Sequence, residues 1–164
     1  MSGLALFTLF HTAISIAAQI VGLFLVYGFL NGQRTPRLTL WALGLLAATT
    51  ITGFLFPIHG FTPALGTGIV STVLLALAAV ARYRFDMAGP WRAVYVVSAV
   101  AALYLDWFVF VVQAFVKIPP LHALAPTGTE PAFVAAQAVV LLAFVIAGYF
   151  SVKRFHFGLL PSGA

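Results

Sequence analysis

Cysteine is absent from this sequence of 164 residues. Disulfide bonds, thiolate metal sites and Cys-X-X-Cys redox chemistry are therefore excluded. Charge is also scarce, because charged residues make up 7% of the chain and only three of them are acidic. So little polar surface cannot cover a water-soluble globule, and the composition excludes that class of protein.

Hydrophobic residues fill the sequence instead. They make up 63% of the chain and give it a mean hydropathy of +1.11, which indicates a membrane protein. A helix that crosses the hydrocarbon core, about 30 Å thick, needs roughly 20 mostly apolar residues. We therefore expect an all-α fold, a polytopic membrane helix bundle with five transmembrane helices that forms a single domain over 1–164. The expected spans are about 6–30, 38–57, 64–82, 91–117 and 131–152.

The ends of these spans are marked by residues that stop helices. The basic turn "NGQRTPR" follows the first span, and "RYRFDMAGPWR", the most polar segment, follows the third. Pro57 ends the second span, and Pro119 and Pro120 end the fourth, because proline lacks the amide donor and disfavours helix just before it. No basic residue precedes the first apolar run, which favours a retained first span over a cleaved signal peptide.

The basic residues fall in the short connections between spans. With five crossings, seven of them lie on one side of the membrane: Arg34, Arg37, Arg82, Arg84, Arg92, Lys153 and Arg154. Only Lys117 lies on the other side. Because short cytoplasmic loops collect lysine and arginine, the N-terminus is expected outside and the C-terminus in the cytoplasm. The net charge of +5 is thus assigned to topology in a lipid bilayer, and no nucleic-acid partner is expected.

Polar side chains follow one face of several spans. In the fourth span four of them lie within roughly 40° of one another around the helix axis. They are Tyr95, Asp106, Gln113 and Lys117. The first span carries a second stripe of His11, Ser15 and Gln19, and in the fifth span Glu130 and Gln137 share a face. We expect polar groups from the first, fourth and fifth spans to converge in the outer half of the bundle.

Asp106 lies within the apolar run "ALYLDWFVFVVQAFVK". A carboxylate near the bilayer centre costs at least about 2.5 to 3.5 kcal/mol, so it should face the bundle interior or water. It should then be neutral through desolvation or bond across to another span. The structural interpretation is an interhelical hydrogen bond, and the functional one is a site for a ligand, proton or cofactor. Trp107 beside it needs a partner or a bound ligand for its indole N–H.

Three histidines lie toward the expected outer face: His11, His59 and His122. Imidazoles of His11 and His59 on adjacent helices could ligate a haem b or, with His122 or Glu130, a divalent or copper ion. Histidine at a helix end is also commonly a solvated or capping residue, and this sequence has no histidine pair at i and i+4. The sequence therefore leaves open whether these histidines bind a cofactor.

A cluster of small polar residues lies near the end of the second span. Thr49, Thr50 and Thr52 are expected to bond back to carbonyls of their own helix. With Gly53 they are expected to form a small face for close helix packing.

Four strings carry a resemblance to a known group: "FHTAISIAAQIVG", "TGFLFP", "AGPWRAVYVVSAVAALYLDWFVFVVQAFVKIPPLHALAPTGTEPAF" and the closing "RF". They resemble a functionally unassigned family of small multi-pass inner-membrane proteins of proteobacteria. The resemblance covers nearly the whole chain and is densest from Ala88 to Phe133. It implies a bacterial inner (cytoplasmic) membrane and adds no activity. It also implies that asparagine is usual at position 106, which favours hydrogen bonding over proton carrying.

Three classes of function remain. The first is an accessory subunit or small-ligand-binding module of a larger membrane complex, because a chain with such short loops has little room for catalysis. The second is a haem- or quinone-handling redox protein that uses the outer histidines and the stripe of Asp106, Gln113 and Lys117. The third is a small transporter or channel with Asp106 at the midplane, which a homo-oligomer would help. No nucleophile elbow, His-Glu-X-X-His motif or phosphate-binding glycine loop is present, which favours a protein that is not an enzyme.

Overall fold

The computed structural model describes residues 2–57, 60 and 62–155. Over these residues the chain is helical and contains no strand. Its elements are α1 (Gly3–Leu30), α2 (Pro36–Phe54), α3 (Pro63–Ala79), the π-helical turn η1 (Val80–Arg84), α4 (Trp91–Lys117), α5 (Pro119–Leu124) and α6 (Pro131–Arg154). In the described part of the chain, five helices are long and apolar enough to cross a membrane, counting α3 and η1 as one.

The predicted spans match these five helices to within a few residues at each end. The third is the least regular, since α3 ends at Ala79 and continues as η1 to Arg84. Thr62 caps the start of α3 by accepting a hydrogen bond from the backbone N–H of Leu65. The short helix α5 was not expected, and it lies in the proline-rich connection between the fourth and fifth spans.

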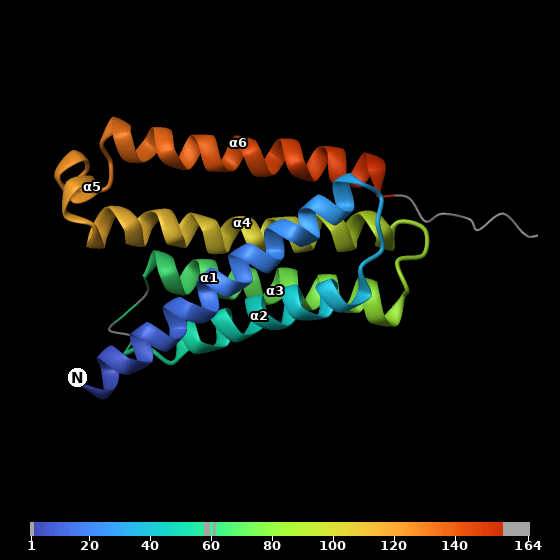
Figure 1. Cartoon of the computed structure of the whole chain (residues 1–164), viewed down its shortest axis with the longest axis horizontal. Helices are drawn as coiled ribbons and strands as arrows, with labels where there is room; N and C mark the ends of the chain where they lie inside the picture. Colours follow the sequence, from blue (N-terminus) through green and yellow to red (C-terminus); the bar gives the residue numbers. More distant parts are fainter. Residues whose placement is uncertain (1, 58–59, 61, 156–164) are drawn as a thin grey trace, which may run out of the picture.

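α4 is the central helix of the bundle and packs against α1, α2, α3 and α6 (Figure 1). Along the other edges α1 packs on α2, and α2 packs on α3. α6 contacts α4 and α1 and leaves most of its apolar side chains exposed, as expected of a helix whose outer face meets lipid. The bundle therefore consists of four helices around a common interior, with a fifth against the outside of α4 and α1.

α1 crosses the bundle obliquely, so that its N-terminal half moves away from α4 and α6 (Figure 1). α1 and α4 approach closely near their middles, where a Cβ atom placed on Gly22 of α1 would lie 2.4 Å from Cδ1 of Leu103 on α4. Only a residue without a side chain fits at this crossing. On the N-terminal side of this contact α1 diverges from α4 and runs along α2.

The two ends of the bundle differ in charge. One end, called here the N-terminal end, carries the start of α1, the α2–α3 connection and α5, and Lys117 is its only lysine or arginine. The opposite end, called here the basic end, carries the other seven: Arg34, Arg37, Arg82, Arg84, Arg92, Lys153 and Arg154. The structure thus reproduces the separation of charge that the sequence predicts.

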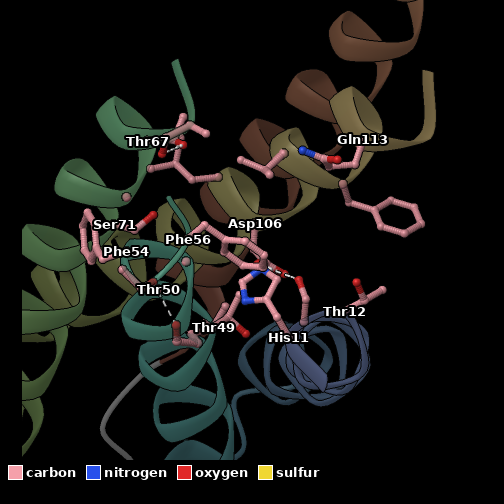
Figure 2. Close-up of a pocket in the computed structure, with 18 of the residues that line it drawn as sticks. His11, Thr12, Thr49, Thr50, Phe54, Phe56, Thr67, Ser71, Asp106 and Gln113 are labelled. Carbon is pink, nitrogen blue, oxygen red and sulfur yellow. Dashed lines mark hydrogen bonds between the residues drawn. The ribbon is translucent and has the colours of Figure 1, made fainter. Parts of the chain in front are cut away.

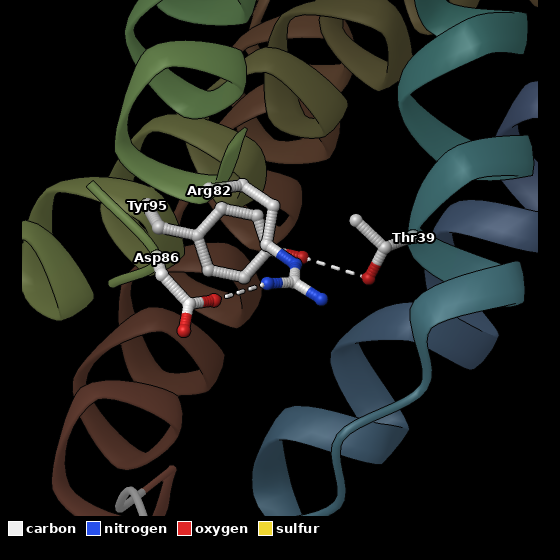
Figure 3. Close-up of polar contacts among 4 residues, drawn as sticks. All are labelled: Thr39, Arg82, Asp86 and Tyr95. Carbon is white, nitrogen blue, oxygen red and sulfur yellow. Dashed lines mark hydrogen bonds and ion pairs between the residues drawn. The ribbon is translucent and has the colours of Figure 1, made fainter. Parts of the chain in front are cut away.

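The most tightly packed region lies toward the basic end. The ring of Phe29 on α1 packs edge-on against that of Tyr95 on α4, and the ring of Phe155 lies against both. Tyr95 is 1% exposed, and its hydroxyl shares a 2.9 Å hydrogen bond with Thr39 of α2. Figure 3 shows this bond beside the ion pair between Arg82 and Asp86, 2.9 Å long. The basic end is therefore closed by packing, which leaves the N-terminal end as the open one.

Candidate functional site

A cavity of about 610 Å³ lies between α1, α2, α3 and α4 at the N-terminal end. Its walls come from the N-terminal half of α1, the C-terminal halves of α2 and α4, and the start of α3 (Figure 2). It exists because α1 and α4 diverge on this side of the Gly22 crossing. Its volume falls in the range typical of small-molecule sites, about 300 to 1,000 Å³.

Asp106 lies on the α4 wall of the cavity and is held from α1. The hydroxyl of Ser15 donates to its carboxylate, with 3.1 Å from Oγ to Oδ1 and 3.4 Å to Oδ2. The amide of Gln19, one turn further along α1, lies near the same carboxylate. Its buried Nε2 makes no well-formed hydrogen bond to any described residue. The structure thus brings Asp106, Ser15 and Gln19 together; Asp106 and Ser15 line the cavity, and Gln19 is buried behind them.

His11 lies one turn before Ser15 on α1 and lines the same cavity. Its Nδ1 is 2.8 Å from Oγ1 of Thr52 on α2. The ring of Phe56 packs edge-on against the imidazole, with the ring centres 5.1 Å apart. These contacts fix the ring between α1 and α2, and Figure 2 shows it on the side of the cavity near Asp106.

Hydroxyl groups make up much of the remaining polar lining. Four threonines, one or more from each of α1, α2 and α3, bond back to carbonyls of their own helices. They are Thr8, Thr12, Thr50 and Thr67. Thr49 differs, because its Oγ1 is buried and makes no hydrogen bond within the described part of the chain. A buried hydroxyl without a partner costs about 1 to 3 kcal/mol.

The outer part of the cavity is lined by α4 residues that follow Asp106. Phe110, Gln113 and Lys117 lie there and are exposed at the side facing away from the bundle core. Between them and the hydroxyls, the lining is aliphatic and aromatic, including Ile16 and Phe54. The cavity therefore has a largely apolar lining, polar groups from all four helices and, among the described residues, one lysine or arginine, Lys117.

Two candidate residues from the fifth span lie elsewhere. Gln137 donates from Nε2 to the carbonyl of Phe108 across the α4–α6 contact, at 3.1 Å. Glu130 binds within its own loop, where its carboxylate accepts from the backbone N–H groups of Thr127 and Thr129. The expected convergence of the first, fourth and fifth spans is thus wrong in one respect. α6 packs on a different face of α4 from the cavity, and α2 and α3 supply the other walls.

The loop contacts of Glu130 change its acidity. The backbone N–H of Thr127 is the main cause, with its hydroxyl and the N–H of Thr129 adding to it, and together they lower the pKa of Glu130 to about 2. The carboxylate orders the connection between α5 and α6 in its ionised form. This role is structural and local.

The remaining candidates do not line the cavity. Trp107 packs against the hydrophobic core, and its buried Nε1 has no hydrogen-bond partner among the described residues. His122 is exposed on α5. His59 lies outside the residues that the structure describes. No group of three or more histidine, aspartate and glutamate side chains placed to hold a metal ion occurs in the described part of the chain.

Comparison with protein-family models, with curated proteins and with solved structures found no match to this chain. The site therefore has to be interpreted from its own geometry.

Sequence reasoning missed the contribution of α2 and α3 to the site. The sequence pattern assigns Thr49 and Thr50 to hydrogen bonds within their own helix and to helix packing, and it gives Thr67 and Ser71 no part in a site. The bonds of Thr50 and Thr52 to their own helix are as predicted. Gly53, however, does not support close helix packing, because the nearest atom to a Cβ placed there is Cε1 of His11, 3.8 Å away. The unusual density of small polar residues in these two spans was the available signal.

Proposed function

We propose that this chain is a small-ligand-binding module of a membrane, with its binding site in the cavity between α1, α2, α3 and α4. The observation that carries the proposal is a cavity of about 610 Å³ with a largely apolar lining and a few polar side chains. Asp106, Ser15 and His11 are among them. An apolar cavity with a few convergent polar groups is the usual form of a small-molecule site.

We further propose that the N-terminal end faces the outside and the basic end the cytoplasm of a bacterial inner membrane. The support is the separation of seven basic residues from Lys117, because cytoplasmic loops collect lysine and arginine. In this orientation the cavity lies in the outer half of the bilayer. A larger complex or a homo-oligomer stays a prediction, and the exposed face of α6 is apolar enough to meet either lipid or a partner helix.

The alternative functions also stay predictions. A haem or quinone site would use His11, which among the described histidines is the one that lines the cavity. A transport role would use Asp106, which the structure bonds to Ser15. Neither is favoured by an observation beyond those that support ligand binding.

The proposal is tested by asking what the protein carries out of the membrane. The protein is extracted into polymer-bounded lipid discs, and bound small molecules are identified by mass spectrometry after solvent extraction. Gly53→Phe places a ring in the cavity, where a Cβ atom has room. Gly44→Phe is the matched control on the same helix, since Gly44 is exposed and has no neighbouring atom within 4 Å of a Cβ.

The expected result is a compound in near-stoichiometric amount with the wild type and with Gly44→Phe, and its loss from Gly53→Phe. Circular dichroism and size-exclusion chromatography check that both variants keep the helical fold. Identical extracts from the two variants would contradict the proposal.

A further inference from the structure

We infer that the ligand of the cavity is a lipid-soluble alcohol or phenol, whose polar end donates hydrogen bonds from hydroxyl groups. The inference rests on the proposed function, because it names the class of ligand for the same site. Its basis is a count of the hydrogen-bond donors and acceptors that α1 and Asp106 present to the cavity and that other protein groups do not already use. On this wall, formed by α1 and Asp106, the groups that line the cavity are rich in acceptors, and their own donors are already used; Nε2 of Gln19, a donor of α1 without a well-formed bond to any described residue, does not line the cavity.

The first part of the count concerns the threonines. A hydroxyl group has one proton to donate and two lone pairs that accept. Thr8 and Thr12 on α1 give their protons to the carbonyls of Leu4 and Thr8, each at 2.8 Å. Their oxygens line the cavity with lone pairs only.

The second part concerns His11. Thr52 donates its only proton to its own helix, 2.7 Å from Oγ1 to the carbonyl of Ala48. With the Thr52 proton on this carbonyl, the 2.8 Å contact between His11 and Thr52 uses the proton of the imidazole, and we assign Nδ1 as the donor. In a neutral ring with its proton on Nδ1, Nε2 is an acceptor. Nε2 makes no hydrogen bond to any residue that the structure describes, and the ring lines the cavity.

The third part concerns the inner end of the wall. Ser15 gives its proton to Asp106, 3.1 Å away, so its oxygen has only lone pairs left. A carboxylate has about four lone-pair positions, and Ser15 occupies a part of them. His11 and Asp106 are therefore two acceptors that flank Ser15. A molecule with two hydroxyl groups can donate to both.

The donors of the cavity lie elsewhere. Thr49 and Ser71 belong to the α2 and α3 walls, and Gln113 and Lys117 lie further along α4 than Asp106. A ligand that could only accept hydrogen bonds would leave Nε2 of His11, and the lone pairs of Asp106 that Ser15 does not occupy, without partners. Removing water from unpaired acceptors is unfavourable, so the wall discriminates against such a ligand. The rest of the lining is apolar, which accommodates the body or tail of a lipid-soluble molecule.

Decylubiquinol and decylubiquinone are suitable probes, because they share one carbon skeleton and differ by two hydrogen atoms (two protons and two electrons), which turn two carbonyl acceptors into two hydroxyl donors. The protein in lipid discs is titrated with each under anaerobic conditions, the quinol being kept reduced, with empty discs as the control for partition into lipid. Binding is followed by the shift in thermal unfolding of the protein. We expect the quinol to bind about tenfold more tightly than the quinone, as unpaired buried acceptors imply.

Variants connect this preference to named residues. His11→Leu removes the acceptor and should bring the ratio of the two affinities close to one, whereas His11→Gln keeps an acceptor oxygen and should keep a preference for the quinol. Gly53→Phe should abolish binding of both probes, and Gly44→Phe should change neither. The unfolding temperature without ligand shows whether each variant is folded.

The outcomes separate the two proposals. Equal binding of quinol and quinone, with loss of both in Gly53→Phe, overturns the inference and supports the proposed function. Binding of decylamine in place of the quinol also overturns it, because the site would then select a cation. Binding of neither probe overturns it as well, and the extraction experiment then decides the proposed function independently.

Discussion

Arg92 on α4 donates from Nη1 to the carbonyl of Val152 on α6, at 2.8 Å, and also bonds the carbonyl of Phe155 just beyond that helix. The last carbonyls of a helix have no partner within the helix, and a cation is favourable at this end of the helix dipole. Few residues of α6 are buried against the rest of the bundle. This contact is therefore a main polar connection between α6 and α4 at the basic end.

Arg92→Leu should destabilise the protein by about 1 to 3 kcal/mol, because part-buried carbonyls lose a charged donor. Unfolding by SDS in mixed micelles measures the change in free energy. Arg37→Leu is the control, since Arg37 is exposed near the start of α2 and should change stability by less than about 0.5 kcal/mol. Equal effects of the two substitutions would show that Arg92 does not fix α6.

Ser15→Ala should cost about 0.6 to 2 kcal/mol, the usual size of a hydrogen bond between helices in a membrane. The change removes the donor to Asp106 and leaves the acceptor in place. Thr12→Ala is the control, because Thr12 is exposed and its hydroxyl bonds only its own helix.

Asp106→Asn should be milder than Ser15→Ala, since the amide oxygen can still accept from Ser15. Thermal unfolding in detergent compares all three variants. If Asp106→Asn were the most damaging of them, the negative charge would matter more than the hydrogen bond.

Gly22→Ala should destabilise the α1–α4 crossing, because the new methyl group would lie 2.4 Å from Cδ1 of Leu103 and that side chain would have to move. Overpacking of this kind costs about 1 to 3 kcal/mol. Gly44→Ala should have the opposite effect. A Cβ atom at position 44 meets open space, so the better helix propensity of alanine should stabilise α2 by up to about 1 kcal/mol. SDS unfolding of both variants tests the pair, and a stabilising Gly22→Ala would contradict the close approach.

Glu130 should make the order of the α5–α6 loop depend on pH. Its pKa lies at about 2 in the folded chain and at an ordinary value of 4.5 otherwise, so the folded loop favours the ionised form. The contribution to stability is complete above about pH 4.5 and is lost as the pH falls toward 2. The amide proton shifts of Thr127 and Thr129, followed by NMR in micelles, should titrate with a midpoint near 2. A midpoint near 4.5 would show that the carboxylate is not bound by these groups.

The number and position of the membrane spans follow from local chemistry, and they could be predicted from the sequence. A span is a property of one continuous segment, because the bilayer demands both its length and its hydrophobicity. Prolines at positions 57, 119 and 120 and the basic turns gave the ends of the helices to within a few residues. The separation of basic residues between the two ends followed from the same count of crossings. The π-helical turn at Val80–Arg84 was not predicted, since no local pattern distinguishes it from the end of an α-helix.

The candidate site could be predicted from the sequence only in part. The sequence identified Asp106, His11, Gln113 and Lys117 as polar residues on exposed or interior stripes, and it required a partner for Asp106. That the partner is Ser15, and that α2 and α3 complete the cavity in place of α6, depends on which helices become neighbours. The order of helices around a bundle is set by the packing of apolar faces, as at Gly22 and Leu103, and almost every face of this chain is apolar. The sequence by itself therefore determined the membrane, the crossings and the polar residues, and only the tertiary structure decided which of those residues meet.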